Sequence, residues 1–265
     1  MKLLLPGTFV GIGILLVAAF VLLRPVPEKS LGDWERPPVA DPRVSMKETI
    51  RLRAADGVEI VGDYYPAWGT RGVLLLHMMP ADRKSWQELA VKLQQAGFHA
   101  LAIDLRGHGE SRGGPLGYKQ FSDVEHQASR LDVEAGAAFL REKGVLDLSL
   151  VGASIGANLA LEYLVNHLEA RAAVLLSPGL DYRGLAIGPF MEKLGPAQTT
   201  MLVASEDDIY SFDTVQLLAR QAVLSKRRMV KIFKGGGHGT AIFERYPEFV
   251  DEVVTWVARL RAEVR

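Results

Sequence analysis

The stretch that decides the fold of this chain is Leu148-Ser149-Leu150-Val151-Gly152-Ala153-Ser154-Ile155-Gly156. Its first four residues are typical of a buried strand, and a helix is expected from Ile155 to residue 167. Between them lies the pattern G-x-S-x-G, in which a sharp turn from strand to helix presents a serine hydroxyl above the edge of a sheet. Ser154 is therefore the candidate nucleophile. The backbone N–H of Ile155, at the helix start, is a candidate donor to a developing oxyanion.

Alternating strands and helices surround this turn. Two strands are expected around a turn at Asp56-Gly57, at 45–53 and 58–65. Further strands at 72–77, 98–105, 147–152, 172–176, 199–205 and 228–233 alternate with helices at 85–95, 121–142, 155–167, 214–223 and 241–262. This order predicts an α/β fold with a mostly parallel eight-stranded sheet that helices cover on both faces. The chemistry should lie at the carboxyl ends of the strands.

Two helical segments carry more specific expectations. The helix at 121–142 is expected to bury one apolar stripe, which consists of Val124, Leu131, Ala135, Ala138 and Phe139. The segment from Pro178 to Gln198 lies where a lid could form, and we expect a small apolar cap helix there. Its apolar residues are Leu185, Ile187, Phe190, Met191 and Leu194.

A serine nucleophile needs a neighbouring base, and the chain has six histidines. Only His238 lies in a glycine-rich loop after the last strand, in the sequence Gly-Gly-Gly-His-Gly at 235–239. That loop follows the carboxyl end of its strand, on the same edge of the sheet as Ser154. His238 is therefore the candidate base.

The base in turn needs a carboxylate to fix its tautomer and stabilise its charged form. Three acidic residues, Glu206, Asp207 and Asp208, follow the strand at 199–205. The spacing from Ser205, the small residue that closes this strand, favours Asp208. Asp207 is the alternative, and Asp181, after the preceding strand, is a more distant candidate.

The segment Asp104-Leu105-Arg106-Gly107-His108-Gly109-Glu110-Ser111 resembles the D-x-R-G-x-G-x-S stretch of the α/β-hydrolase superfamily, common in its esterases, lipases and monoacylglycerol-lipase-like members. The resemblance covers residues 45–263, and the order Ser154, Asp208, His238 is the one expected for this fold. It implies a carboxylesterase-like serine hydrolase that cleaves a small acyl ester through an acyl-enzyme, with no metal or cofactor. It also implies that the sequence His77-Met78-Met79 replaces the usual His-Gly-X, so that the Met79 N–H is the second oxyanion donor.

Related reactions stay open at this point. The same fold hosts thioesterases, amidases, peptidases and acyltransferases, and some members only bind ligands. Such binding members typically lack a triad residue, and none is missing here. A serine at the turn argues against a haloalkane dehalogenase, which usually places an aspartate there. The pattern His-Glu-x-x-His of a helical zinc site does not occur in the sequence.

The N-terminal segment differs from the rest of the chain. No charged residue occurs from Leu3 to Leu23, a length that matches a membrane-spanning helix, and five prolines follow within 25–43. We expect an anchor at 1–24, a linker at 25–43 and a catalytic domain at 44–265. A cleaved signal peptide is the alternative for the first segment. The charges flanking the apolar segment conflict, because Lys2 favours one orientation and Arg24 the other; we expect the domain to be exported.

Composition excludes several classes. The chain of 265 residues has 31 basic and 31 acidic residues, so it carries no basic excess for a nucleic-acid partner. It contains no cysteine, which excludes disulfides, thiolate metal sites and a cysteine nucleophile. With 48% hydrophobic residues it can bury a sizeable core.

Overall fold

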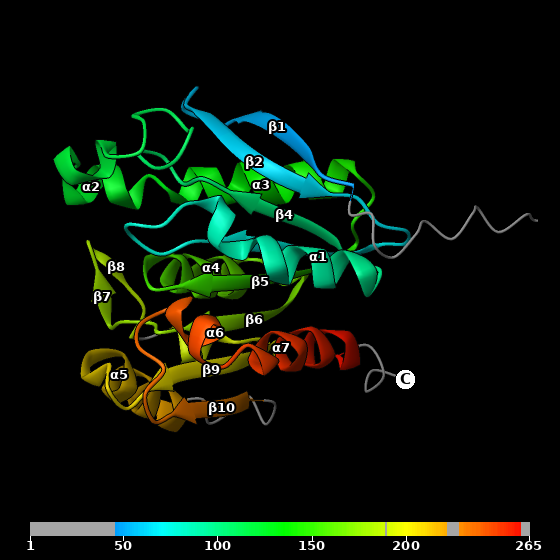
Figure 1. The fold of residues 1–265 in the computed structure, drawn as a ribbon. Coiled ribbons are helices and arrows are strands. Elements are labelled where there is room, and N and C mark those ends of the chain that lie inside the picture. The colour runs from blue at the N-terminus through cyan, green and yellow to red at the C-terminus, as the bar shows by residue number, and fades with distance from the viewer. Residues whose placement is uncertain (1–45, 189, 222–227, 261–265) are drawn as a thin grey trace, which may run out of the picture. The chain divides into compact units, whose positions relative to one another are not determined.

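A computed structural model describes residues 46–188, 190–221 and 228–260, which belong to one compact unit (Figure 1). Its main feature is an eight-stranded sheet with the strand order β1-β2-β4-β3-β5-β6-β9-β10. The strands are β1 (Glu48–Arg53), β2 (Glu59–Tyr65), β3 (Arg71–Leu76), β4 (His99–Ile103), β5 (Asp147–Ala153), β6 (Ala170–Leu176), β9 (Thr199–Ser205) and β10 (Arg228–Phe233). β1 and β2 are antiparallel to their neighbours, and the other six strands are parallel. The predicted α/β class and sheet are confirmed.

Helices cover both faces of the sheet. On one face lie α1 (Gln87–Gln95), α6 (Ala241–Arg245) and α7 (Glu248–Arg259); on the other lie α3 (Arg130–Glu142), α4 (Ile155–Asn166) and α5 (Ile209–Gln221) (Figure 1). Along β3, Leu74 and Leu76 enter one core cluster, while Val73 and Leu75 enter the other. This alternation with a period of two explains why a strand buried on both faces has a continuous apolar sequence.

The helix expected at 121–142 is two helices, α2 (Asp123–Gln127) and α3, and of the predicted buried stripe only Leu131 and Phe139 pack, partly buried, against the core. Val124 is 74% exposed, and the residues of α3 that are buried are Asp132, Val133, Gly136, Ala137 and Leu140. Asp132 can be buried because its carboxylate accepts hydrogen bonds from Arg106. Gly136 lies on the buried stripe because the helix approaches Leu74 closely there: a Cβ would lie 2.9 Å from its Cδ1.

The cap helix expected within 178–198 is also wrong. The segment forms a short hairpin of β7 (Asp181–Tyr182) and β8 (Leu185–Ala186), followed by the 3-10 turn η3 (Met191–Lys193). Four of its apolar side chains enter the core instead of covering the site from outside: Leu185, Ile187, Met191 and Leu194. The segment is therefore tied to the domain by its own side chains.

Smaller differences concern the ends of helices. The helix expected at 85–95 starts with the 3-10 turn η1 (Arg83–Trp86) before α1, and another 3-10 turn, η2 (Gly117–Gln120), precedes α2. The closing helix divides into α6 and α7 around Pro247, because proline removes a backbone donor and disfavours a helical residue before it.

The described chain begins and ends at the amino edge of the parallel strands. β1 runs in the same direction as β4, since both are antiparallel to β2. Gln94 donates to the carbonyl oxygens of both Met46, which precedes β1, and Pro66, which follows β2, at 2.8 and 2.7 Å. The last helix returns to the same edge, where Arg71 donates to the Ala258 carbonyl at 3.5 Å.

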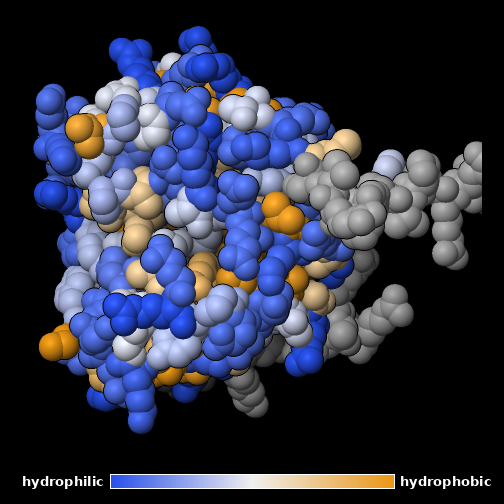
Figure 2. Space-filling view, viewed as in Figure 1, coloured by the Kyte–Doolittle hydropathy of each residue, from blue (hydrophilic) through white to orange (hydrophobic). Residues whose placement is uncertain are grey.

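The surface facing the viewer in Figure 2 is mostly hydrophilic, and its apolar side chains lie in small separate patches. Within residues 46–188, 190–221 and 228–260, no helix is long and apolar enough to span a bilayer. The predicted anchor at 1–24 and linker at 25–43 lie outside the described residues.

Candidate active site

Ser154 lies in a strained turn between β5 and α4. Its backbone has φ 54° and ψ −120°, which is costly for a residue other than glycine. A Cβ on Gly152 would overlap the Gly156 carbonyl oxygen, and a Cβ on Gly156 would overlap the Leu76 carbonyl oxygen. The two glycines therefore let the turn close and pack against the carboxyl end of β3. The Ser154 N–H is fixed by the Leu176 carbonyl at 2.9 Å.

His238 and Asp208 are brought together. His238 Nδ1 lies 2.7 Å from Asp208 Oδ2, although 30 residues separate them in the chain. Burial raises the pKa of Asp208, but hydrogen bonds from His238 and Ser211, together with the charge of a protonated His238, outweigh it, and the net pKa is lowered. The carboxylate is therefore ionised at neutral pH and holds the proton of the imidazole on Nδ1, which leaves Nε2 free to accept another.

The other candidate acids lie elsewhere. The Asp207 carboxylate accepts a hydrogen bond from the Gly237 N–H at 3.1 Å, and it is exposed on its outer side. Asp181 Oδ1 accepts from the Gly184 N–H at 2.6 Å, within the turn of the β7–β8 hairpin. Asp207 therefore shapes the loop that carries His238, and Asp181 shapes the hairpin.

Two serines hold the glycine-rich loop at 235–239. Ser205 Oγ accepts from the Gly236 N–H at 2.5 Å and donates to the Phe233 carbonyl at 3.1 Å. Ser177 Oγ accepts from the Gly239 N–H at 2.9 Å, and it also hydrogen-bonds to Asp208. The loop is thus tied at both ends to residues that close strands β9 and β6.

The loop after β3 is fixed by His77. Its Nε2 accepts from the Leu105 N–H at 2.9 Å, so the proton lies on Nδ1, which donates to the Met78 carbonyl at 2.9 Å. Burial lowers the pKa of His77 to about 4, so the ring is neutral. In a trans peptide the N–H points opposite to the C=O, so the Met79 N–H points away from His77.

The three loops around Ser154 touch one another. A Cβ on Gly239 would overlap Met78 Sδ and would lie 3.4 Å from the Cβ of Ala153. Gly239 therefore joins the histidine loop to the turn at Ser154 and to the loop at 77–79. No Ser154–His238 hydrogen bond occurs among the described residues; such bonds are often long in a free enzyme and shorten when substrate binds.

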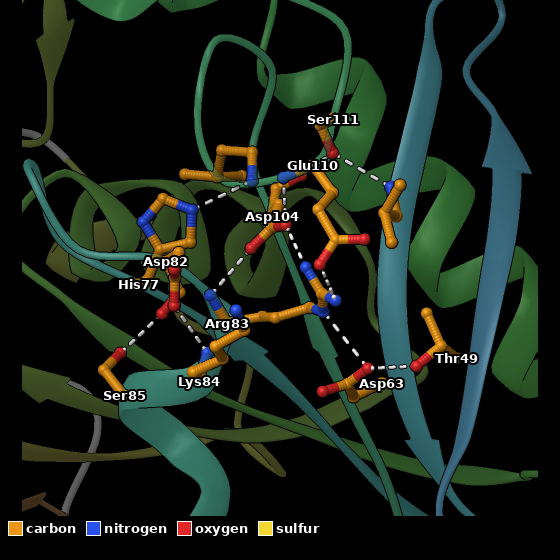
Figure 3. A network of polar contacts seen from close by, with 12 residues as sticks. Thr49, Asp63, His77, Asp82, Arg83, Lys84, Ser85, Asp104, Glu110 and Ser111 are labelled. Carbon is orange, nitrogen blue, oxygen red and sulfur yellow. Dashed lines mark hydrogen bonds and ion pairs between the residues drawn. The ribbon is translucent and has the colours of Figure 1, made fainter. Parts of the chain in front are cut away.

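A buried ionic network holds the far end of the loop after β3 (Figure 3). Arg83 forms ion pairs with Asp63 of β2, at 3.1 Å, with Asp104 after β4, and with Glu110, at 2.8 Å. Its backbone N–H also donates to Asp104 Oδ1 at 2.8 Å. His77 and Arg83 thus clamp the two ends of the segment that contains Met79.

The D-x-R-G-x-G-x-S stretch has a structural role at each fixed position. Asp104 belongs to the network just described, and Arg106 donates to Asp132 of α3 and to Asp56. A Cβ on Gly109 would overlap the Asp104 carboxylate, and Gly107 has φ 75°. Ser111 Oγ donates to the Asp104 carbonyl at 2.7 Å and accepts from the Val61 N–H at 2.9 Å. The motif therefore folds a buried loop beside the site.

The sequence reasoning missed Tyr182, Ser177 and Ser211. Ser177 directly follows β6, so the rule that polar groups matter at strand ends could have found it. Tyr182 comes from the hairpin, and its hydroxyl lies 3.3 Å from Ser211 Oγ and 3.4 Å from the Ser177 carbonyl oxygen. Burial raises the pKa of Tyr182, while hydrogen bonding to Ser211 and Ser154 lowers it, and the net pKa is raised. No local pattern marks this tyrosine.

Comparisons with known proteins bear on the family and the fold. Residues 70–199 match the model of a family described as serine aminopeptidase, S33. A non-heme haloperoxidase of Rhodococcus erythropolis is 31% identical over 123 residues, which are 46% of this chain and 40% of the haloperoxidase. Protein ABHD14A of Mus musculus is 26% identical over 249 residues, 88% of this chain and 87% of that protein. In structure, an esterase of Pyrococcus furiosus has a TM-score of 0.67 at 18% identity, covering 82% of this chain and 91% of the esterase.

Proposed function

Because this chain belongs to the α/β-hydrolase superfamily, we propose that it is a serine hydrolase that cleaves a small acyl ester. Ser154 is the nucleophile, His238 the base and Asp208 the acid. The observation that carries the proposal is the contact of 2.7 Å between His238 Nδ1 and Asp208 Oδ2, in a loop that packs against the strained turn of Ser154. The alignment covers only 40% of the haloperoxidase, so we do not infer haloperoxidase activity for this chain.

In the proposed reaction, Ser154 Oγ attacks the acyl carbon while His238 Nε2 accepts the serine proton. The carbonyl oxygen becomes an oxyanion, to which the Met79 and Ile155 N–H groups donate. His238 then gives the proton to the leaving alkoxide as the C–O bond breaks. Water, activated by the same histidine, cleaves the acyl-enzyme. Loss of one oxyanion donor typically slows such reactions about 100- to 1000-fold. No step requires a metal or cofactor.

We further propose a short or medium acyl group as the substrate. The segment at 178–198 supports this, because it is short and its apolar side chains, such as Leu185, enter the core instead of forming a large lid that could enclose a long chain. A series of esters that differ only in acyl length tests the proposal. Strong turnover of long-chain triglycerides with none of short esters would contradict it.

A second candidate is cleavage of an amide or peptide bond, which the description of the matching family model favours. The same machinery also serves thioesters and acyl transfer. Matched ester, thioester and amide substrates that share one acyl group decide among these reactions, and the ratio of their kcat/KM values is the measurement.

A fluorophosphonate probe, which labels activated serines, tests the nucleophile. The wild-type chain should be labelled, and Ser154→Ala should not. Ser85→Ala, which removes an exposed serine, is the matched control and should be labelled like wild type. A folded wild-type chain that resists the probe would refute the enzyme proposal. Labelling of Ser154→Ala would refute the assignment of the nucleophile.

The residues at 1–24 are proposed to anchor an exported domain to the membrane, through the linker at 25–43. Their apolar sequence supports this proposal. Expression of the full chain, followed by extraction of membranes with alkaline carbonate, tests it. An anchored chain stays in the membrane fraction, and a chain with a cleaved signal peptide is released and shortened.

A further inference from the structure

In addition to its own apolar side chains, the hairpin β7–β8 is fixed to α4 by one buried polar side chain. Asn158, one turn after Ser154, donates from Nδ2 to the carbonyl oxygens of Gly179 and Leu185, at 2.8 and 2.7 Å. Its Oδ1 accepts from the Gly179 N–H at 3.2 Å. The residue that leads into β7 and the first residue of β8 are thereby fixed to the helix that begins at the nucleophile.

This anchoring places Tyr182 beside the catalytic residues. Its ring and that of His238 lie edge to face, with centroids 6.3 Å apart and planes at 84°. Its hydroxyl reaches Ser211 Oγ and the Ser177 carbonyl, and both of these serines also hydrogen-bond to Asp208. Tyr182 therefore contacts the base and the nucleophile, and two serines link it to the acid.

The Tyr182 ring is itself fixed from behind. Tyr210, at the start of α5, packs edge-on against it with centroids 5.7 Å apart. The Tyr210 hydroxyl accepts from the Asp181 N–H at 3.0 Å and donates to the Asp181 carbonyl at 3.1 Å. A Cβ on Gly179 would lie 2.6 Å from both rings, so the backbone there closes on the pair. The ring is therefore packed against both Tyr210 and the backbone at Gly179.

The mechanism of acyl transfer indicates which part of a substrate lies beside the Tyr182 ring. In acyl transfer, the leaving oxygen must lie at His238 Nε2 to receive the proton there. The oxyanion donors Met79 and Ile155 belong to the loop after β3 and the start of α4, whereas Tyr182 lies against the His238 ring. We therefore expect the group attached to the leaving oxygen to extend past Tyr182.

We infer that Tyr182 is a specificity-determining residue that limits the size of the leaving alcohol, while the acyl group is bound elsewhere. This inference rests on the proposed ester hydrolysis. It assigns the restriction to the aromatic ring and not to the hydroxyl.

Two pairs of esters test the inference, with kcat/KM measured for wild type and variants. Ethyl and 2-phenylethyl acetate differ only in the alcohol, and both alcohols are primary. Ethyl acetate and ethyl hexanoate differ only in the acyl group. Tyr182→Ala should raise the ratio of 2-phenylethyl to ethyl acetate about tenfold or more, a typical effect of pocket size. The acyl ratio should stay within about threefold of wild type.

Three further variants separate the effect of the ring from that of the hydroxyl, from disturbance of the hairpin and from misfolding. Tyr182→Phe retains the ring and should keep both ratios. Leu180→Ala, in the same segment, is the matched control for disturbance of the hairpin and should also keep both. Tyr182→Leu replaces Tyr182→Ala if the latter does not fold.

Each outcome is informative. An unchanged alcohol ratio in Tyr182→Ala, or a change confined to the acyl ratio, overturns the inference while leaving ester hydrolysis intact. An equal change in Tyr182→Phe overturns the role of the ring. A wild-type chain that hydrolyses none of these esters and resists the fluorophosphonate refutes the proposed function, and the inference falls with it.

Discussion

Asp208 occupies a position that favours a charged carboxylate. It directly precedes α5, and its carbonyl accepts the Phe212 N–H at 2.9 Å, so the side chain lies at the positive end of the helix. Asp207, one residue earlier, points to the Gly237 N–H instead. Adjacent residues in a turn thus serve two separate purposes, one electrostatic and one conformational.

The pair Asp207 and Asp208 gives a matched prediction. Asp208→Asn removes the charge that stabilises protonated His238 and its tautomer, and we expect kcat to fall about 10³- to 10⁴-fold. Asp207→Asn keeps an acceptor for the Gly237 N–H, and we expect less than about a threefold change. Steady-state kinetics on one acyl ester measures both. Equal losses in the two variants would contradict the assignment of the acid.

Single site residues could be predicted from the sequence where they belong to a local pattern of strand and turn. Ser154, Asp208 and His238 each follow a strand within a recognisable turn, and spacing alone selected Asp208. Tyr182 could not be named, because it approaches His238 only through the packing of the hairpin on α4. Long-range contacts of this kind leave no periodic signal in the chain.

Elements were predictable where their apolar pattern reflects burial alone. The strands β9 and β10 have the bounds expected from the sequence. The pattern failed for α3, because Asp132 is buried by its pairing with Arg106, and for 178–198, because Asn158 supplies polar partners to a hairpin backbone. Hydrophobic periodicity does not reveal buried polar groups whose hydrogen-bond partners are far away in the sequence.

Asn158 allows a test of the hairpin. Asn158→Ala leaves the Gly179 and Leu185 backbone groups without their buried partner, which typically costs about 1–3 kcal/mol. We expect a lower Tm and faster trypsin cleavage after Arg183, in the turn of the hairpin. Asn166→Ala, an exposed position on the same helix, is the control and should change neither. Unaltered cleavage in Asn158→Ala would show that the hairpin is held by its apolar side chains alone.

For the whole molecule, two buried imidazoles link stability to pH. Burial lowers the pKa of His77 and of His108 from the ordinary value of 6.5 to about 4. Between these values the unfolded chain binds more protons than the folded one, so the free energy of unfolding falls as the pH falls. The contribution is fully present above pH 6.5 and is lost towards pH 4. It is on the order of 3 kcal/mol for each histidine.

Urea unfolding at several pH values between 7 and 4 measures this effect. The free energy of unfolding of wild type should decrease steadily through this range. His108→Asn lowers stability overall, but its slope against pH should be smaller, because one of the buried imidazoles that titrate in this range is absent. A slope in His108→Asn equal to that of wild type would contradict the role of this imidazole.

The two ends of the described chain have a practical consequence. Met46, before β1, and Ala258, near the end of α7, both lie at the amino edge, whereas Ser154 and His238 lie at the carboxyl edge. A strand of seven residues, such as β5, spans roughly 23 Å. A fluorescent protein, affinity tag or solid support joined directly before Met46 or directly after α7 therefore attaches on the side remote from the catalytic groups. Immobilised preparations should keep an unobstructed opening for reagents.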